Sequence, residues 1–409
     1  MAYSYPVKFI HSGMRNAPAL SGTTGTLVAV LDALLISGWG AATALSVTVT
    51  GGVGTATFNS GTTFDAHAVV AISGSSEAIL NGEARVLTSA SSGITFETDA
   101  PDGAYSGVIA FRYAPVGQWE IAHTATGKRV YRSTDVLGSR FVYRVDDSST
   151  GVAARTARVR AYESMTDIDT GTNPAPHDSQ MSGGGYWGKS SMAGATASGY
   201  YIFADSRFIL YCPQVGRSQS ATFTGAFSWG MGDYTPLSNV DVFSSGVSVG
   251  NSEAYGDGIY ANAGGVGVGP TSYDSGAGTY LMRAHSGLGG AVRVQSNRPE
   301  VGSAQGPVGP YVLSGADGVF GAAPSSVTGD VLVTRRILTA HDSLSPRCAV
   351  PGYLYIPQHN ALSILPIGST VPGTGPYAGR TLLSIPLAST SGAAPADAVA
   401  LVDITGPWR

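Results

Sequence analysis

Glycine divides most of this chain into short apolar segments. The 409 residues include 56 glycines, and β-branched or aromatic runs of a few residues alternate with clusters of Gly, Ser, Asn, Asp and Pro. Branched and aromatic side chains fit a pleated surface, and the separating residues favour turns. The pattern predicts an all-β, multi-domain fold.

Three strand pairs follow from this pattern. Residues 46–50 and 55–58 flank a Gly-rich turn and predict a hairpin. Residues 140–145 and 156–162 predict a second pair, and 200–203 with 207–211 a third, which turns at Asp205 and Ser206.

One short N-terminal helix is predicted between Thr23 and Gly38, where apolar residues recur at helical spacing. We expect Thr23 or Thr24 to cap its start and Gly38 to end it.

These elements suggest four regions. Residues 1–45 form an extended arm and the helix, and residues 46–115 form a small β-barrel or sandwich module. Residues 116–345 form the main β domain, a larger β-sandwich region, and residues 346–409 form an extended C-terminal β segment. The arm and the tail are expected to reach onto neighbouring subunits.

The charge content is low for a soluble protein. Only 12% of the residues are charged, about half of the usual share of roughly 25%. We infer that other subunits cover much of the surface, which predicts a homo-oligomer. The net charge of −4 argues against DNA as a partner, and no apolar run is long enough for membrane insertion.

No segment predicts an enzyme, a metal site or a cofactor. Residues 246–250 match the G-x-S-x-G pattern, but no helical periodicity follows them. Residues 167–173 space oxygen atoms as calcium loops do, but lack the closing glutamate. Two cysteines are too few for a disulfide framework, and Cys212 is expected to be a buried thiol.

A basic patch is predicted in residues 128–160. This window holds eight basic side chains and three aspartates, a local charge of +5 in a chain of −4. Such a surface would dock an acidic neighbour, including an identical subunit. The alternatives are contact with phosphate groups of a cell envelope or DNA, and a solvated hairpin face. The eight residues are Lys128, Arg129, Arg132, Arg140, Arg144, Arg155, Arg158 and Arg160.

Aromatic residues provide the other interface candidates. Tyr186, Trp187 and Lys189 follow three consecutive glycines, which predicts a flexible loop with two exposed rings. Trp408, next to Arg409, is a further candidate. Exposed Tyr and Trp anchor interfaces and stack on sugars; the alternative is that the loop folds back onto its own domain.

Both ends of the chain resemble a known family. Residues 9–22 (FIHSGMRNAPALSG), followed by Leu31-Asp32-Ala33, and residues 403–408 (DITGPW) are similar to a family of virion structural proteins of tailed bacteriophages and prophages. Between them, residues 68–74 (AVVAISG) and 94–96 (ITF) resemble a small β module common in phage virion proteins. The resemblance implies a virion component of the tail or its adsorption apparatus, and it carries over no catalytic residue.

The expected function is therefore structural. The chain would be made in the bacterial host cytoplasm and would assemble with itself and with other tail proteins as a symmetric ring or trimer in the tail, tail tip or baseplate. The alternative is a receptor-binding protein that recognises host cell-surface glycans through residues 183–189 and 246–278. A polysaccharide-degrading enzyme is the third hypothesis.

Overall fold

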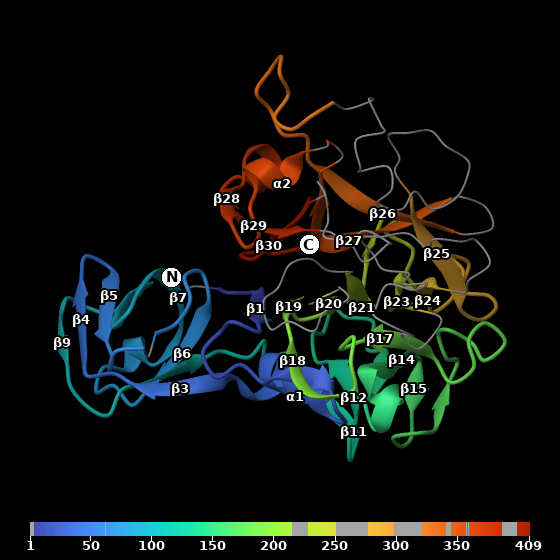
Figure 1. The fold of residues 1–409 in the computed structure, drawn as a ribbon, viewed down its shortest axis with the longest axis horizontal. Helices are drawn as coiled ribbons and strands as arrows, with labels where there is room; N and C mark the ends of the chain where they lie inside the picture. The colour runs from blue at the N-terminus through green and yellow to red at the C-terminus, as the bar shows by residue number, and fades with distance from the viewer. Residues whose placement is uncertain are drawn as a thin grey trace.

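The computed structural model describes residues 4–61, 63–214, 228–250, 277–297, 321–340, 345–356, 358, 360–386 and 399–409. Strands dominate these ranges, which hold two short α-helices, α1 (Thr26–Asp32) and α2 (Ala361–Ile364). The predicted all-β, multi-sheet fold with a short helix near the N-terminus is confirmed. Figure 1 shows a small module beside a larger body.

The body is built on a 13-stranded sheet of antiparallel pairs within the described ranges. It includes the predicted pair at 200–203 and 207–211, whose Phe203 and Leu210 are cross-strand partners. In spatial order its strands are β1 (Lys8–His11), β19 (Tyr200–Ala204), β20 (Phe208–Pro213), β21 (Trp229–Asp233), β23 (Ser245–Val249), β24 (Gly278–Leu281), β25 (Val292–Asn297), β26 (Thr334–Ala340), β27 (Pro346–Tyr355), β30 (Val399–Asp403), β29 (Thr381–Pro386) and β28 (Thr370–Pro372), with β22 (Thr235–Pro236) beside β27.

A five-stranded sheet forms the second layer of the body and lies below β19–β24 in Figure 1. Tyr143 and Trp187 reach from it to β23, where they hydrogen-bond Ser245 and Ser248. The predicted pairing of 140–145 with 156–162 is confirmed. The strands are, in order, β11 (Trp119–Ala125), β12 (Lys128–Ser133), β13 (Val142–Asp146), β14 (Thr156–Tyr162) and β17 (Gly185–Gly188), and the outer hairpin β15 (Ser164–Met165) and β16 (Gly171–Thr172) lies nearby.

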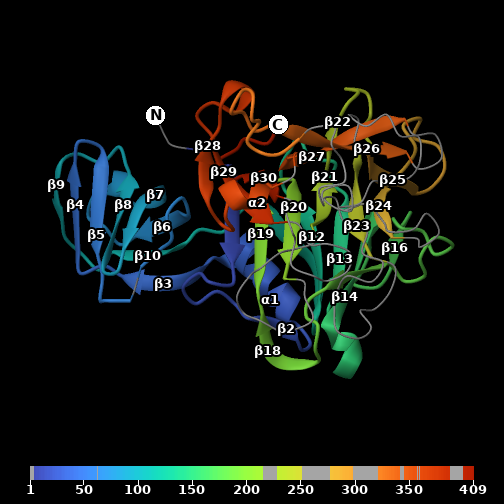
Figure 2. The ribbon, with the colours of Figure 1, turned by 45° about the horizontal axis from the view of Figure 1, so that its top comes forward.

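The small module is an eight-stranded sheet that projects from the body in Figures 1 and 2. The predicted hairpin turns at Gly51 and Gly52, whose φ angles of +59° and +78° favour glycine. Its strands are β3 (Trp39–Thr43), β10 (Ala110–Tyr113), β6 (Val69–Ser73), β7 (Gly82–Ala90), β8 (Gly93–Glu97), β5 (Val53–Thr57), β4 (Ser46–Thr50) and β9 (Gly103–Tyr105). The module thus includes β3, which lies inside the region expected to be the arm.

The helix differs from the prediction at its start. α1 begins at Thr26 and continues as a π-helix, Ala33–Ser37, which Gly38 ends at φ +69°. The N-cap is Gly25, with no side-chain cap, instead of Thr23 or Thr24. The carboxylate of Asp147 accepts a hydrogen bond from the Leu27 N–H at 2.8 Å, so a residue distant in sequence satisfies this helix end.

The described segments near both chain ends pair with strands of their own chain. β1 pairs along its whole length with β19, and β2 (Leu20–Gly22) pairs with β18 (Gly194–Ser198). The C-terminal strands extend the 13-stranded sheet. The prediction of arms that reach onto neighbours is therefore wrong for the described residues, because pairing within the chain satisfies their backbone groups.

Candidate functional site

The predicted aromatic loop is a strand. Residues 185–188 pair with β14, and this pairing places Trp187 on the inner face of the sheet, where it is 0% exposed. Its Nε1 donates to the Ser248 carbonyl at 2.7 Å, and its ring stacks on Tyr211 with centroids 5.1 Å apart. The prediction that Trp187 is exposed in a flexible loop is wrong, because strand pairing fixes which face each side chain occupies.

Tyr186 alternates to the other face of β17 and is half-buried. The guanidinium of Arg158 lies over its ring, with Cζ 4.1 Å from the centroid. Arg158 is its cross-strand partner, so register creates this cation–π contact. Of the two predicted aromatic anchors in 183–189, only Tyr186 keeps partial access to solvent.

Lys189 is fully buried and forms an internal ion pair with Asp147, which is also fully buried. Its ammonium also donates to the Thr23 carbonyl at 2.7 Å. Because the same carboxylate accepts from Leu27, the pair ties β17 and the end of β13 to the start of α1. Lys189 is thus a structural residue and does not reach a partner's surface.

Trp408 also packs into its own chain. It is 8% exposed, and its Nε1 donates to the Asp403 carbonyl at 2.8 Å. Its ring meets Phe208 edge-on, with centroids 6.3 Å apart. The indole therefore holds the C-terminal turn against β20.

The predicted basic patch is largely neutralised within the chain. Several of its cations form ion pairs with acidic residues of the same chain. Most of these acidic residues lie outside residues 128–160, so the local charge of +5 did not count them. The pairs are Lys128–Asp169 at 2.9 Å, Arg129–Asp32 at 3.0 Å, Arg132–Glu120 at 2.5 Å, Arg144–Asp146 at 2.7 Å and Arg160–Asp178 at 3.0 Å.

The remaining cations of the window differ from one another. Arg155 is buried and donates to the Val152 carbonyl at 3.1 Å. Arg140 is exposed, with φ +65°, and within the described ranges it has no ion pair. Arg140 is thus an exposed cation of the window without an ion pair to a described residue, and it is close in sequence to an exposed apolar surface.

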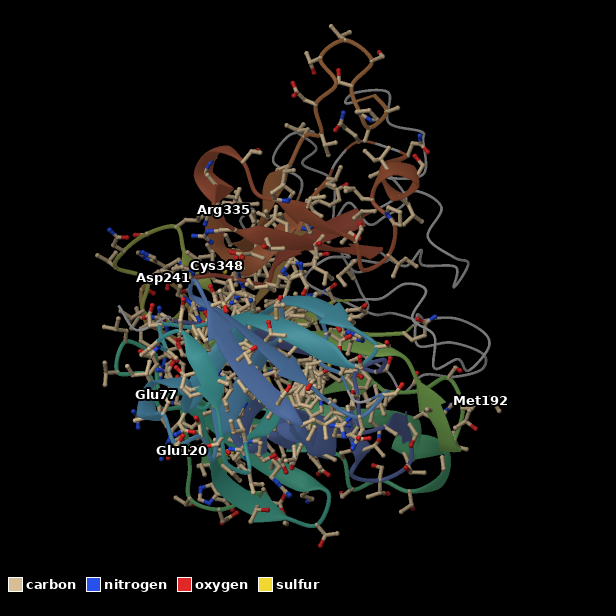
Figure 3. All side chains as sticks on the ribbon, turned by 90° about the vertical axis from the view of Figure 1, so that its left-hand side faces the viewer. Glu77, Glu120, Met192, Asp241, Arg335 and Cys348 are labelled. Carbon is tan, nitrogen blue, oxygen red and sulfur yellow. The ribbon has the colours of Figure 1, made fainter. Side chains whose placement is uncertain are left out.

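That surface is an apolar loop patch. It joins the loop between β12 and β13 to the loop between β22 and β23, and Leu137 and Val242 line one cavity of about 290 Å³ between them. Figure 3 labels Asp241 at this outer edge of the body. The loop patch consists of Val136, Leu137, Leu237, Val240 and Val242, which are 89%, 76%, 44%, 70% and 67% exposed.

The signal for the loop patch was present in the sequence. The apolar residues there occur within turn-forming sequences rich in Asp, Ser, Asn and Gly. A turn offers no strand face on which these side chains could be buried. Nothing in their spacing shows that the two loops, about a hundred residues apart in sequence, lie together. Only the fold brings them to one cavity.

The segments considered for catalysis and metal binding have structural roles. Ser248 is buried inside β23, and its Oγ accepts from the Gly230 N–H, so it occupies no exposed turn. Asp167 caps a turn by accepting from the N–H groups of Asp169 and Thr170 at 2.8 Å. Among the described residues no three His, Cys, Asp or Glu side chains converge as metal ligands. Residues 251–276, predicted as glycan-contacting loops, lie outside the described residues.

Both cysteines are buried free thiols, which confirms the prediction for Cys212. Burial raises the pKa of Cys212 to about 12, so its reactive thiolate is suppressed. No helix in the part of the chain that the structure describes has the length and apolar character needed to cross a bilayer.

Comparison with known proteins adds no relative: no protein-family model matches this chain, and no curated protein matches its sequence.

Proposed function

We propose that this chain is a structural component of a tailed-bacteriophage virion, in the tail, tail tip or baseplate, and that it assembles as a symmetric homo-oligomer. Two lines of argument support the proposal. The end segments 9–22 and 403–408 resemble a family of virion structural proteins, and the chain has few charges for its length.

The observation that carries the assembly part of the proposal is the loop patch. Leu137 and Val242, exposed apolar side chains from two loops, line one cavity, and Val136, Leu237 and Val240 of the same loops are also exposed. Contiguous exposed apolar surface marks interaction sites, whereas scattered single residues need no explanation. A second copy is the occupant we favour, because closed symmetry buries such a patch without leaving an open contact.

Polar side chains accompany the apolar ones at this cavity, whose lining includes Asp233 and Asp241 beside Leu137 and Val242. An interface core buries apolar side chains and its rim carries polar ones. An interface between subunits at the loop patch does not require pairing between the edge strands of their sheets.

Mutation of the loop patch tests the assembly part of the proposal. We expect the purified chain to be oligomeric by light scattering at micromolar concentration and Val136→Asp with Val242→Asp to shift it to monomer. Val327→Asp is the matched control, because Val327 lies outside the patch and is 90% exposed, against 89% for Val136.

Two outcomes would contradict the proposal. A wild-type chain that stays monomeric, alone and with purified tail proteins, removes the assembly role. Absence of the chain from purified particles of the producing phage, judged by mass spectrometry, removes the virion role.

The alternative function is receptor recognition through residues 183–189. It required Trp187 to be an exposed aromatic side chain. Trp187 is buried, and the Arg158 guanidinium lies over the ring of the half-buried Tyr186. Glycan recognition through this segment is therefore not our preferred function.

A further inference from the structure

A cleft of about 500 Å³ lies beside the C-terminal turn. Strands β26, β27 and β30 and the 3-10 turn Gly375–Tyr377 surround it. Figure 3 labels Arg335 on this C-terminal layer, above Cys348. The side chains that define the cleft are Arg335, Tyr377, Arg380, Asp403 and Trp408.

The cleft is electropositive. Its lining holds the side chains of Arg335, Arg380 and Arg409 against the single acidic side chain of Asp403. Arg380 is held by Asp403 at 2.7 Å, and Arg409 by Asp205 at 3.3 Å. Arg335 is exposed and forms no ion pair with any described residue. One guanidinium is therefore available to an anion.

An aromatic ring stands beside these cations. The guanidinium of Arg380 lies 5.9 Å from the centroid of Tyr377. Burial raises the pKa of Tyr377, and the nearby charges of Arg335 and Arg380 oppose this shift. Arg335 and Arg380 line the same cleft as Tyr377, so an aromatic ring and two guanidiniums face one space.

The wall of the cleft is held rigidly. Asp403 is 1% exposed, and its Oδ1 accepts from the N–H groups of Thr405 and Gly406 at 3.0 Å and 2.9 Å. Gly352 lacks the Cβ that would otherwise lie 2.1 Å from the Trp408 Nε1. The 403–408 turn is therefore fixed before any ligand arrives, which lowers the entropic cost of binding.

We propose that this cleft binds a carboxylate-bearing sugar residue of an acidic glycan. A guanidinium fork pairs with a carboxylate in two parallel hydrogen bonds, and an aromatic face suits the C–H face of a pyranose ring. One unpaired cation matches a monoanion, and the volume lies in the usual range for small-ligand sites. The proposal does not depend on the virion assignment.

Titration calorimetry on the full chain tests it. The probes are digalacturonate, diglucuronate and disialic acid, with neutral digalactose and inorganic phosphate as comparisons. We expect at least one acidic disaccharide to bind at least ten times more tightly than digalactose or phosphate.

Variants locate the binding in the cleft. Arg335→Ala should weaken binding by about tenfold or more, because a charge-assisted hydrogen bond is lost, and Arg335→Lys should restore only part of it. Tyr377→Ala should weaken binding while Tyr377→Phe retains it. Arg140→Ala, which removes another exposed unpaired arginine, is the control and should bind as wild type.

The proposal is overturned if no acidic disaccharide binds, if phosphate binds as tightly as the acidic sugars, or if Arg335→Ala binds unchanged. Thermal melting of each variant distinguishes lost binding from lost folding. Because Arg335 is exposed and unpaired, its replacement should leave the melting temperature unchanged.

Discussion

Burial of the individual side chains determines the roles of the two aromatic residues in β17 (Gly185–Gly188). Trp187 and Tyr186 are neighbours in sequence but lie on opposite faces of β17. Trp187 joins the main core with Tyr211, whereas Tyr186 lies against a guanidinium. A substitution at each position should therefore have a different cost.

We expect Trp187→Ala to lower the free energy of unfolding by about 3–5 kcal/mol, the usual range for a large aromatic truncated in a core. Tyr186→Ala should cost less, because the exposed part of a cation–π contact contributes little. Urea denaturation of both variants measures the difference. Equal losses would contradict the burial of Trp187.

The Asp147–Lys189 pair should show strong coupling. Removing one partner of a buried ion pair leaves an uncompensated charge, so Lys189→Met should cost about 3–5 kcal/mol. The double variant with Asp147→Leu should cost less than the sum of the single variants. A double-mutant cycle in urea measures this coupling, and simple additivity would argue against a shared buried contact.

Elements are joined by side chains as well as by backbone pairing. Arg283, which follows β24, donates to Glu163 beside β15, with Nη2 2.9 Å from Oε2. This contact links the outer hairpin β15–β16 to the 13-stranded sheet. Because it involves an ionised carboxylate, its contribution should depend on pH.

The hydrogen bond from Arg283 lowers the pKa of Glu163 below its usual 4.5. The folded state therefore favours the ionised form, and the stabilisation is present above pH 4.5 and lost as the pH falls through the folded-state pKa. Glu163→Gln should thus be less stable than wild type at neutral pH, with the difference shrinking in acid. Denaturation across pH measures it; Arg283→Met should show the same loss, and a difference independent of pH would contradict the assignment.

Strand pairs were the most predictable elements. The hairpin at Gly51 and Gly52 follows from a local turn preference, and β13 with β14 follows from alternating side chains next to a turn. The helix start was not predictable, because the carboxylate that accepts from its Leu27 N–H belongs to Asp147, more than a hundred residues away in sequence. Most ion pairs of the basic patch escaped prediction for the same reason.

At the scale of the whole molecule, one continuous core links the small module to the body. Trp39 stacks on Tyr113 at the base of the module, with centroids 4.7 Å apart. At the same junction Lys8 of β1 donates to Glu83 of β7 at 2.5 Å. The module is therefore coupled to the body through both apolar and charged contacts.

We expect the wild-type chain to unfold in one calorimetric transition, because module and body share this core. Trp39→Ala should loosen the junction and separate a lower-temperature transition of the module. Two transitions in the wild-type chain would show that the junction does not couple the two parts.

The sequence by itself determined the all-β class, the short N-terminal helix and the best hairpins, because strand propensity, helical periodicity and glycine turns act over a few neighbouring residues. Only the tertiary structure decided that Trp187 is buried, that Lys189 meets Asp147, and that two apolar loops share one edge. Burial and charge pairing depend on which distant segments pack together, and the energies that select this packing arise only once the sheets have formed.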